Sequence, residues 1–358
     1  MPLTEQEIKE IKDAVDASAR PLVFFDDDCD GTASFVQLYR YKQEGKGVPV
    51  KASPMLDRKY ARKVEEYAPD LVLILDKPLV DDEFFENVKS PIIWLDHHKP
   101  QDVSRWQNVR YYNPRLHDDK DNLPVTYWMY RVTGGPLWIA TVGAIADWHI
   151  PDYFGLFKEQ YPDLLPSGYA RVEDLLYSPD SRLGRLARII SFNLKGTAQE
   201  TMKSVLVLTR IETPYEILNQ TTPRGKYLYK KYARLATKYE GLLHRAKSAL
   251  EPDSPVLLFL YEDESMSLTS DLSNELLYQY PERFIVIARK HGGEYKYSLR
   301  SGGRYEIPPI MGKALQGVDG YGGGHTYACG ASVKEKDNEK FLAVIREEIT
   351  RLDAQRQH

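Results

Sequence analysis

Four acidic residues stand together in the stretch "VFFDDDCDGTAS", residues 23–34, where an apolar run leads directly into them. They are Asp26, Asp27, Asp28 and Asp30. Carboxylates this close repel one another and resist burial unless solvent screens them or a cation binds them. The stretch therefore raises the question of which other residues could complete a cation site.

Further candidates lie in three separate stretches: Asp76, then Asp96 with His97 and His98, then Asp147. Carboxylates with a minority of imidazoles and no thiolate favour Mn²⁺ or Mg²⁺ over structural zinc. The set is too large for one catalytic ion. We expect two ions about 3.5–4 Å apart, with Asp76 as the bridging ligand.

The chemistry that needs such a pair of ions is hydrolysis at phosphorus. Two ions lower the pKa of a shared water from 15.7 toward about 7, which yields hydroxide at neutral pH, and they offset charge on the phosphoryl oxygens. No nucleophilic side chain is required. Each residue taken alone has a plainer role, such as a turn or helix cap, so the prediction depends on the joint pattern.

The elements that would position these residues are short apolar runs. "PLVFF" (21–25), "LVLIL" (71–75) and "PIIWL" (91–95) have the length of strands buried on both faces of a parallel sheet. Ligands of open α/β sheets bind outside the carboxyl ends of the strands, so the residues that follow these runs should converge. The segment 136–153 is expected to be a buried helix that brings Asp147 to the same crevice.

The whole chain is expected to be an α/β protein in three parts. Residues 1–153 form a parallel-sheet domain, 154–250 a mostly helical connecting segment, and 251–358 a smaller α/β domain. In the last part "VLLFL", "FIVIARK" and "EYKYSLRS" are expected as strands, the glycine-rich "GYGGGHTYACG" as a loop, and residues 338–355 as a closing helix.

Composition agrees with a globular chain. Of 358 residues, 42% are hydrophobic and 28% charged, and no window reaches the ~18 apolar residues of a membrane span. The first twenty residues have the pattern of a charged amphipathic helix rather than a secretion signal. Two cysteines, Cys29 and Cys329, cannot form a disulfide framework. We therefore expect a cytoplasmic protein with no membrane partner.

Positive charge is concentrated between residues 181 and 247, which hold fourteen Lys plus Arg against four Asp plus Glu. Such a segment could bind a phosphate backbone or be a solvated helical surface. Its aromatics could stack on bases, but their helical spacing suits a core role better. They are Tyr227, Tyr229, Tyr232 and Tyr239.

The ordered motifs resemble a known family. "DDDCDG", "LILD", "WLDHHKP" and "GAIADW" are similar, in order and spacing, to the four motifs of the DHH phosphoesterase superfamily. The later stretches "YKYSLRSGG" and "GYGGGHTYACGASV" resemble the companion DHHA1 domain. Members with this layout include the RecJ single-strand exonucleases, their archaeal relatives in replication, and the nanoRNase/pAp phosphatases.

The resemblance implies a role for each motif residue. The implied ligands of two Mn²⁺ ions are Asp28, Asp30, Asp76, His97 and Asp147. His98 would contact the scissile phosphate, and Asp96 would orient the histidines. In the DHHA1 part, the groups implied to hold the far phosphate or terminal nucleotide are Arg300, Ser301, Gly323, Gly324 and His325.

One position separates the branches of the family. The nanoRNase branch carries a histidine four residues before the first Asp of the metal-binding pair, where this chain has Phe24. RecJ-like members have an acidic residue two positions before that Asp, which here is Asp26. The resemblance therefore favours the RecJ-like branch, with Asp26 either a ligand of the first ion or a group that orients the ligands.

Three hypotheses follow. The leading one is a Mn²⁺-dependent exonuclease, with Mg²⁺ as the alternative ion, that hydrolyses single-stranded DNA or RNA or short oligonucleotides from an end, in DNA repair or replication with protein partners. The second keeps the metal site but acts on a small molecule such as a dinucleotide or pAp. The third is a non-catalytic replication scaffold of the DHH family.

Overall fold

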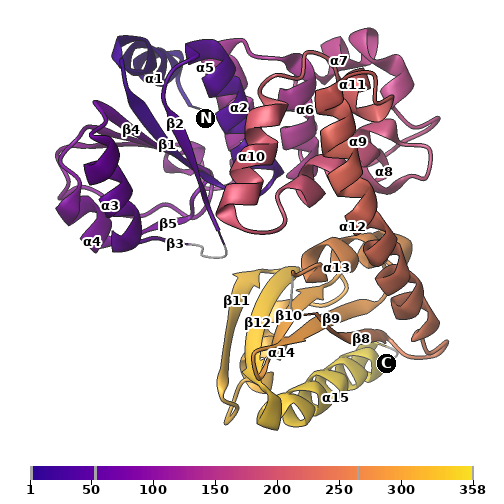
Figure 1. Ribbon diagram of the computed structural model, residues 1–358. Helices are drawn as coiled ribbons and strands as arrows, with labels where there is room; N and C mark the ends of the chain where they lie inside the picture. The colour runs from indigo at the N-terminus through magenta and orange to yellow at the C-terminus, as the bar shows by residue number, and fades with distance from the viewer. Residues whose placement is uncertain (1–2, 52–54, 264–265, 357–358) are drawn as a thin grey trace. The chain divides into compact units, whose positions relative to one another are not determined.

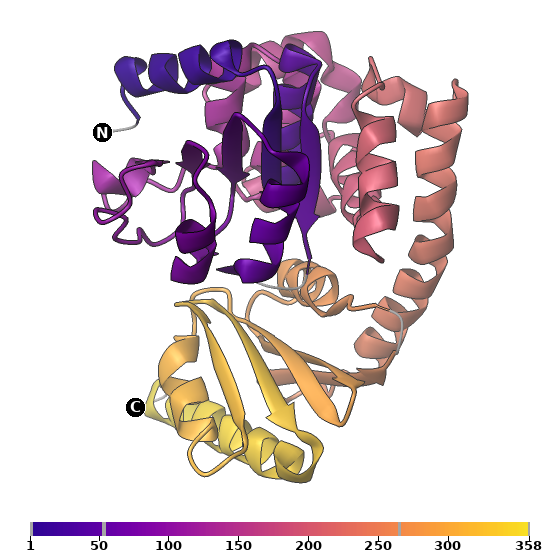
Figure 2. The ribbon, with the colours of Figure 1, turned by 60° about the vertical axis from the view of Figure 1, so that its left-hand side comes forward.

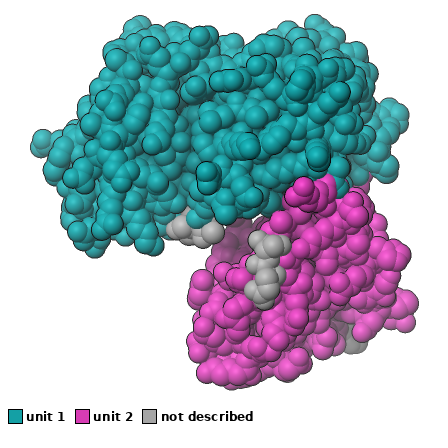
Figure 3. All heavy atoms as spheres, viewed as in Figure 1, with its two compact units in different colours: residues 1–233 teal, residues 234–358 magenta. Residues whose placement is uncertain are grey.

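The computed structural model describes residues 3–51, 55–263 and 266–356. They form two compact units, Met1–Ala233 and Arg234–His358 (Figure 3). The segment expected as a separate helical part, 154–250, is divided between them, because the boundary falls inside the long helix α12 (Pro223–Ser248). Among the described residues, no helix is both long and apolar enough to cross a membrane.

The first unit is built on a five-stranded sheet in the order β2-β1-β4-β6-β7, with every neighbouring pair parallel (Figure 1). Its strands are β1 (Pro21–Asp26), β2 (Lys46–Val50), β4 (Leu71–Leu75), β6 (Ile92–Leu95) and β7 (Val109–Tyr112). The three predicted strands and their parallel arrangement are confirmed. A two-stranded parallel ladder, β3 (Met55–Leu56) with β5 (Leu79–Val80), lies apart from this sheet.

Both faces of this sheet are buried, because consecutive side chains of a strand point to opposite sides. In β1, Phe25 belongs to one core and stacks on Phe35, with ring centroids 4.6 Å apart. Phe24 belongs to the other core and meets Phe84 edge to face at 5.7 Å. The continuous apolar run therefore supplies two cores at once.

Helices cover the two faces and continue into the helical part of the unit (Figures 1 and 2). The first of them confirms the amphipathic pattern of the amino terminus, with a capping box between Thr4 and Glu7. In chain order the helices before α12 are α1 (Glu5–Ala17), α2 (Cys29–Lys42), α3 (Arg58–Tyr67), α4 (Asp82–Asn87), α5 (Val125–Thr133), α6 (Leu137–Ala146), α7 (Phe154–Gln160), α8 (Val172–Tyr177), α9 (Arg182–Asn193), α10 (Ala198–Leu208) and α11 (Pro214–Leu218).

The strand order reverses beside β1. From β1 the chain passes through α2 to β2 on one side, then through α3 to β4 on the other. Residues of α2 belong to one core and residues of α3 to the other, so the two helices leave from opposite faces. A crevice opens at such a switch point outside the carboxyl ends of the strands. The fold thus locates the ligand crevice next to β1 and β4.

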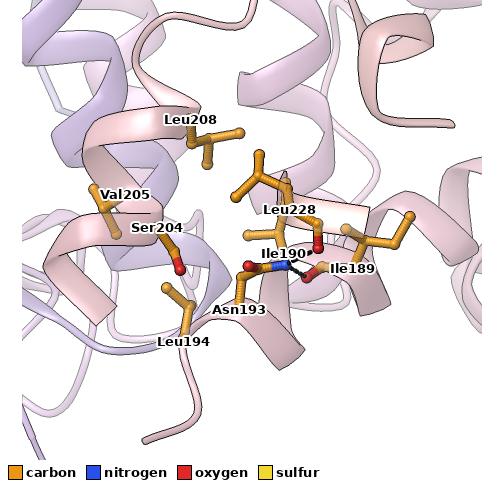
Figure 4. Close-up of a pocket in the computed structure, with 8 residues that line it drawn as sticks. All are labelled: Ile189, Ile190, Asn193, Leu194, Ser204, Val205, Leu208 and Leu228. Atoms are coloured by element: carbon orange, nitrogen blue, oxygen red, sulfur yellow. Dashed lines mark hydrogen bonds between the residues drawn. The ribbon is translucent and has the colours of Figure 1, made fainter. Parts of the chain in front are cut away.

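The described residues of α9, α10 and α12 pack closely enough to leave no substrate cavity among these helices. The void there, lined by Ile190, Val205 and Leu228 among others, measures only about 10 Å³ (Figure 4). Asn193 connects α9 to α12 beside this void, since its Nδ2 donates to the carbonyls of Ile189 at 2.8 Å and Leu228 at 2.9 Å. Such a space is at the lower limit for a single water.

The four tyrosines of the basic segment take part in packing, as their spacing favoured, and three of them are partly buried. Tyr227, Tyr229 and Tyr232 pack against the first unit's core. Tyr239 lies in the second unit, is 1% exposed, and donates to the Glu275 carboxylate at 2.5 Å. These rings therefore serve packing rather than forming an open stacking surface along α12.

The second unit contains a mixed five-stranded sheet in the order β11-β12-β10-β9-β8, in which only β8 and β9 are parallel. It also contains the C-terminal half of α12. Its strands are β8 (Val256–Glu262), β9 (Phe284–His291), β10 (Glu294–Arg300), β11 (Gly320–His325) and β12 (Ala328–Lys334), and its other helices are α13 (Thr269–Gln279), α14 (Ile307–Ala314) and α15 (Asn338–Arg356). The predicted α/β character is confirmed.

The prediction of a loop for "GYGGGHTYACG" is wrong, because this stretch forms the antiparallel hairpin of β11 and β12. Glycines suggested a loop, but here they permit close strand pairing. Gly324 has φ +146°, and a Cβ there would lie 2.4 Å from the carbonyl oxygen of Ala328. Only Thr326 and Tyr327 form the turn.

Candidate metal centre

Parallel strand pairing brings the separate acidic motifs to one edge of the sheet. Asp26 is the last residue of β1, Asp76 directly follows β4, and Asp96 directly follows β6. The ladder continues past the strand ends, since Asp76 N donates to Leu95 O at 3.0 Å and Asp96 N to Tyr112 O at 3.1 Å. The predicted convergence of these motifs is therefore present in the fold.

Asp28 and Asp30 are positioned by the start of α2. Asp28 is the N-cap, and its Oδ1 accepts the N–H of Gly31 at 2.9 Å. Asp30, only 1% exposed, accepts the N–H groups of Val125 at 2.8 Å and Thr126 at 2.6 Å. The first turn of α5 thus fixes Asp30.

Gly31 has a structural role at this turn. A Cβ at this position would lie 2.7 Å from both the backbone N and O of Asp26, which is closer than real side chains approach. Glycine therefore lets the first turn of α2 pack onto the end of β1. Any larger residue would force the backbone at this turn to shift.

Asp147 comes from α6, where it is the C-cap. The helix ends in a Schellman motif, since His149 N donates to Ala144 O at 2.9 Å and Trp148 N to Ile145 O at 3.0 Å. Glycine usually occupies the left-handed position of this motif, but here it is Trp148, with φ +62°. A bulky residue in this region is strained.

His97 lies among three carboxylates. Its Nε2 is 3.4 Å from Asp76 Oδ1, 3.7 Å from Asp147 Oδ2 and 4.0 Å from Asp30 Oδ2. The side chain is 6% exposed. Asp76 itself has φ +60°, an uncommon conformation that aspartate tolerates better than most residues. The backbone at the end of β4 is thus turned to present this carboxylate to His97.

Three overlapping groups have donor atoms close enough to share a cation. They are Asp76 with His97 and His98, Asp30 with His97 and Asp147, and Asp26 with Asp28 and Asp76, each within 4.8 Å. Within the part of the chain that the structure describes, Asp76 Oδ1 and Asp147 Oδ2 are buried and accept no hydrogen bond. Buried carboxylate oxygens of this kind need a positive partner. The residues therefore fit divalent cations.

Crowding and burial alter the acidity of these groups. Burial, with repulsion from neighbouring carboxylates, raises the pKa of Asp30 and Asp76 well above the ordinary value. Burial and the nearby Asp28 raise the pKa of Asp147 to about 8 and that of Asp26 to about 7. Without cations the cluster therefore holds protons at neutral pH, which bound cations would displace.

Asp96 stands beside the cluster and holds His98. Its Oδ1 is 2.8 Å from His98 Nδ1, and its Oδ2 accepts the His98 N–H at 3.1 Å. Burial lowers the pKa of His98, but the hydrogen bond to Asp96 and the negative charges of Asp96, Asp147 and Asp28 together outweigh it, so the pKa is raised overall. His98 Nδ1 is thus directed at Asp96.

Sequence reasoning missed the residues that support this pair. Asn113 is fully buried at the start of the loop after β7, and its Nδ2 donates to His98 O at 2.9 Å and lies 3.3 Å from Asp96 Oδ2. Tyr111 O–H is 3.4 Å from the same carboxylate oxygen. Both residues lie at the carboxyl end of a strand, β7, and this position could have identified them. However, β7 has too few apolar residues to be predicted as a strand.

Lys77 was also missed. Its side chain is 1% exposed, and its Nζ lies 3.1 Å from Asp26 Oδ1. Asp27, by contrast, turns to Lys51, with 2.5 Å between Asp27 Oδ2 and Lys51 Nζ. This ion pair directs Asp27 away from the cluster. The sequence signal for Lys77 was a lysine directly after Asp76.

Of the candidate residues in the second unit, Arg300 and Ser301 have partners inside that unit. Arg300 Nε donates to Asn274 Oδ1 at 2.7 Å, and its Nη1 donates to Leu299 O at 2.9 Å. Ser301 is 3% exposed, and its Oγ accepts the N–H of Tyr305 at 2.9 Å. These contacts orient the Arg300 guanidinium and hold Ser301 in place.

Gly323, Gly324 and His325 are exposed at the end of β11. The carbonyl oxygen of His325 lies 3.2 Å from the Sγ of the buried Cys329 across the hairpin. The hairpin therefore presents backbone and an imidazole together on the surface of the second unit.

The comparisons with known proteins agree with this geometry. Residues 254–351 match the DHHA1 domain family. No curated protein sequence matches the chain. RecJ from Thermus thermophilus, in complex with Mn²⁺, superposes with a TM-score of 0.67 at 17% identity, over 98% of this chain and 56% of that one. The chain thus spans little more than half the length of that RecJ.

Two further structures share the fold. Exonuclease RecJ bound to manganese gives a TM-score of 0.63 at 18% identity and covers 98% of this chain and 96% of that one. The pGpG-specific phosphodiesterase PggH from Vibrio cholerae gives 0.50 at 14% identity, over 94% and 98%. The chain therefore shares the fold of these RecJ structures, and its residues 254–351 match the DHHA1 domain family. The resemblance read from the motifs is confirmed at this level.

Proposed function

We propose that this DHHA1-containing chain is a metal-dependent phosphoesterase that hydrolyses phosphodiester bonds of single-stranded DNA or RNA, or of short oligonucleotides, from an end. The observation that carries the proposal is the overlap of the three donor groups, which share Asp76 and His97. Overlapping groups are what two neighbouring cations need. The RecJ structures with Mn²⁺ support manganese as the ion.

Each residue has a proposed role. Asp76 belongs to two of the donor groups and is the proposed bridge between the ions. The other proposed ligands are Asp26, Asp28, Asp30, His97 and Asp147. Bound ions would lower the pKa of a water molecule and offset negative charge on the phosphoryl oxygens. A resident pair of ions also explains why so many carboxylates can be buried together.

His98 is the proposed contact to the scissile phosphate. Because Asp96 fixes Nδ1, the other ring nitrogen is the one available to a substrate oxygen. Asp96 is therefore a positioning residue that also favours the protonated imidazole. A cationic imidazole attracts a phosphate anion more strongly than a neutral one.

The DHHA1 residues are the proposed site for the far end of the substrate. Exposed glycines allow close approach of a phosphate to backbone N–H groups, and Arg300 carries a guanidinium that pairs well with phosphate. The proposed set is Arg300, Ser301, Gly323, Gly324 and His325. We also propose that the protein acts in the cytoplasm, with replication or repair proteins as partners.

Hydrolysis of end-labelled DNA and RNA ladders tests the proposal. Purified protein in Mn²⁺, in Mg²⁺ and after chelation should release nucleotides from one end only with the metals present. Asp76→Asn should abolish the reaction and reduce Mn²⁺ binding measured by calorimetry. Wild-type protein as inactive as Asp76→Asn on every substrate would instead support the non-catalytic scaffold.

A small-substrate enzyme is the second candidate, because the similar PggH is named a pGpG-specific phosphodiesterase. The same ladder separates the two functions. Cleavage confined to substrates of two to five nucleotides favours the small-substrate enzyme. Cleavage of long strands at comparable kcat/KM favours the exonuclease.

A further inference from the structure

A groove of about 620 Å³ lies in the first unit along the edge strand β2, between α3 and the start of α10. Four of its described lining residues are lysines, Lys46, Lys51, Lys59 and Lys63, and Asp57 is the one carboxylate among the described lining residues. The volume falls within the range of about 300–1,000 Å³ typical of ligand sites. None of these lysines belongs to the basic segment 181–247.

Two of the lysines are placed in a way that folding alone does not favour. Lys59 and Lys63 stand four residues apart on α3, so they share one face of the helix, and both are exposed. Like charges at this spacing destabilise a helix. Lys59 is 89% exposed and 3.5 Å from Asp57, whose carboxylate already caps the helix. The arrangement favours an anion outside the protein.

Another part of the lining comes from the start of α10. Ala198 and Gln199 line the groove at the first turn of α10, where backbone N–H groups have no partner within the helix. The cap there is closed by Glu200, whose carboxylate turns back onto Thr197 at 2.9 Å. The lining of the groove therefore combines lysines of β2 and α3 with the first turn of a helix.

The groove begins beside the metal centre. In the parallel ladder Val50 pairs with Asp26, so the carboxyl end of β2 lies next to the acidic loop. Lys51 follows at once and forms its ion pair with Asp27, while its Nζ donates to Leu194 O at 2.6 Å. A chain of phosphates with one member at the metals could therefore continue past Lys51 into the groove.

An added peptide strand suits this edge less well. Pro49 has no N–H to donate, and proline and lysine on an edge strand are devices that oppose strand addition. Tyr60, half-buried in the lining, offers instead a ring against which a base can pack.

We propose that this groove, lined by Lys46, Lys51, Lys59 and Lys63, binds the phosphate backbone of a single-stranded nucleic acid beyond the phosphate held at the metal centre. The inference rests on the proposed function and deepens it. Substrates longer than a few nucleotides would contact the groove as well as the metal centre, whereas a dinucleotide would be too short to reach the groove.

Fluorescence anisotropy with labelled dT12 and dT3, in EDTA so that nothing is cleaved, tests the groove. Each lysine–phosphate contact contributes about 0.7 to the salt slope, or about fivefold in affinity at 0.1 M salt. Lys59→Ala/Lys63→Ala should therefore bind dT12 about 25-fold more weakly, with the slope reduced by about 1.4. Binding of dT3 should be unchanged.

The matched control removes two exposed lysines elsewhere, Lys9→Ala/Lys158→Ala, on α1 and α7. An equal loss of dT12 binding in the control would overturn the proposal that the groove binds the nucleic acid. Unchanged binding in Lys59→Ala/Lys63→Ala would overturn it as well. Displacement of dT12 by polyglutamate as effectively as by unlabelled dT12 would also overturn it. Mn²⁺-dependent hydrolysis of a dinucleotide is measured separately, so a failure of the proposed function is distinguished from a failure of the groove.

Discussion

Lys77 Nζ lies 3.1 Å from Asp26 Oδ1, and the lysine side chain is only 1% exposed. This ion pair joins the second residue after β4 to the last residue of β1, and these two strands stand on either side of the switch point. Because its positive charge is buried beside a carboxylate cluster, Lys77 partly balances the cluster before any cation binds.

Lys77→Met should destabilise the metal-free protein by about 2 kcal/mol at pH 8, since it leaves the Asp26 carboxylate without this partner. At pH 5.5 the loss should be much smaller, because the pKa of Asp26 is about 7 and the carboxyl is then protonated. Urea unfolding in EDTA measures both values. In Asp26→Asn/Lys77→Met the loss should be less than the sum of the single variants, and simple additivity would contradict a direct pair.

Asp28→Asn should lower hydrolysis of a dinucleotide by at least about 100-fold, as expected when a group that offsets transition-state charge is lost. Asp27→Asn, its neighbour, should stay within about twofold, because Asp27 contacts Lys51 rather than the cluster. Circular dichroism controls for folding, since Asp28 also caps α2. Equal losses in the two variants would disprove the assignment of Asp28.

The metal-free protein should become less stable as the pH rises from 5 to 8. The raised pKa values of Asp30, Asp76, Asp147 and Asp26 mean that the folded state binds more protons than the unfolded chain in this range, so the free energy of unfolding falls with pH. Protonated His98 adds to the trend, and His149, whose pKa burial lowers, opposes it.

Thermal unfolding in EDTA and in excess Mn²⁺ checks this pH dependence. The stabilisation by Mn²⁺ should be larger at pH 8 than at pH 5.5, because protons compete for the same carboxylates. Asp147→Asn should flatten the metal-free profile. A metal-free stability that rises steadily from pH 5 to 8 would show that these carboxyls do not hold protons in the folded state.

Asp96→Asn should shift the pH–rate profile rather than merely reduce the rate. The hydrogen bond and the charge of Asp96 are the largest contributions that raise the pKa of His98, so their loss lowers that pKa. If the protonated imidazole of His98 contacts the phosphate, the alkaline limb of the pH–rate profile should move to lower pH, because the imidazole then loses its proton at a lower pH. A uniform fall in rate with an unmoved profile would indicate a purely structural role.

Trp148→Gly should separate substrate binding from stability. Trp148 is 37% exposed directly after Asp147, with the ring of Tyr177 at 6.2 Å. Glycine removes the strain of φ +62°, so the melting temperature should stay the same or rise. If the indole stacks on a base, KM should increase by about tenfold, within the 1–3 kcal/mol of one stacked base. An unchanged KM would exclude stacking, and Trp148→Phe serves as the conservative control.

The residues of the cluster could be predicted because the sequence shows where the buried strands end. An apolar run followed by aspartate, repeated three times, fixes both the parallel sheet and the edge at which Asp26, Asp76 and Asp96 emerge. Burial on both faces requires such runs. Strands with few apolar residues, such as β2 and β7, cannot be predicted in this way. The contact of Asn113 with His98 could therefore not be predicted either.

Local sequence determined which residues the candidate metal centre contains, because their types and their positions after strands and helices are local properties. Only the tertiary structure decided how they are held: the N–H groups at the start of α5 fix Asp30, the Schellman motif of α6 presents Asp147, and Lys77 balances Asp26. It also turned the glycine-rich stretch into a hairpin, because pairing with β12 outweighed the local preference of glycine for loops. Contacts between distant segments carry no local signature, and they set the distances on which the chemistry depends.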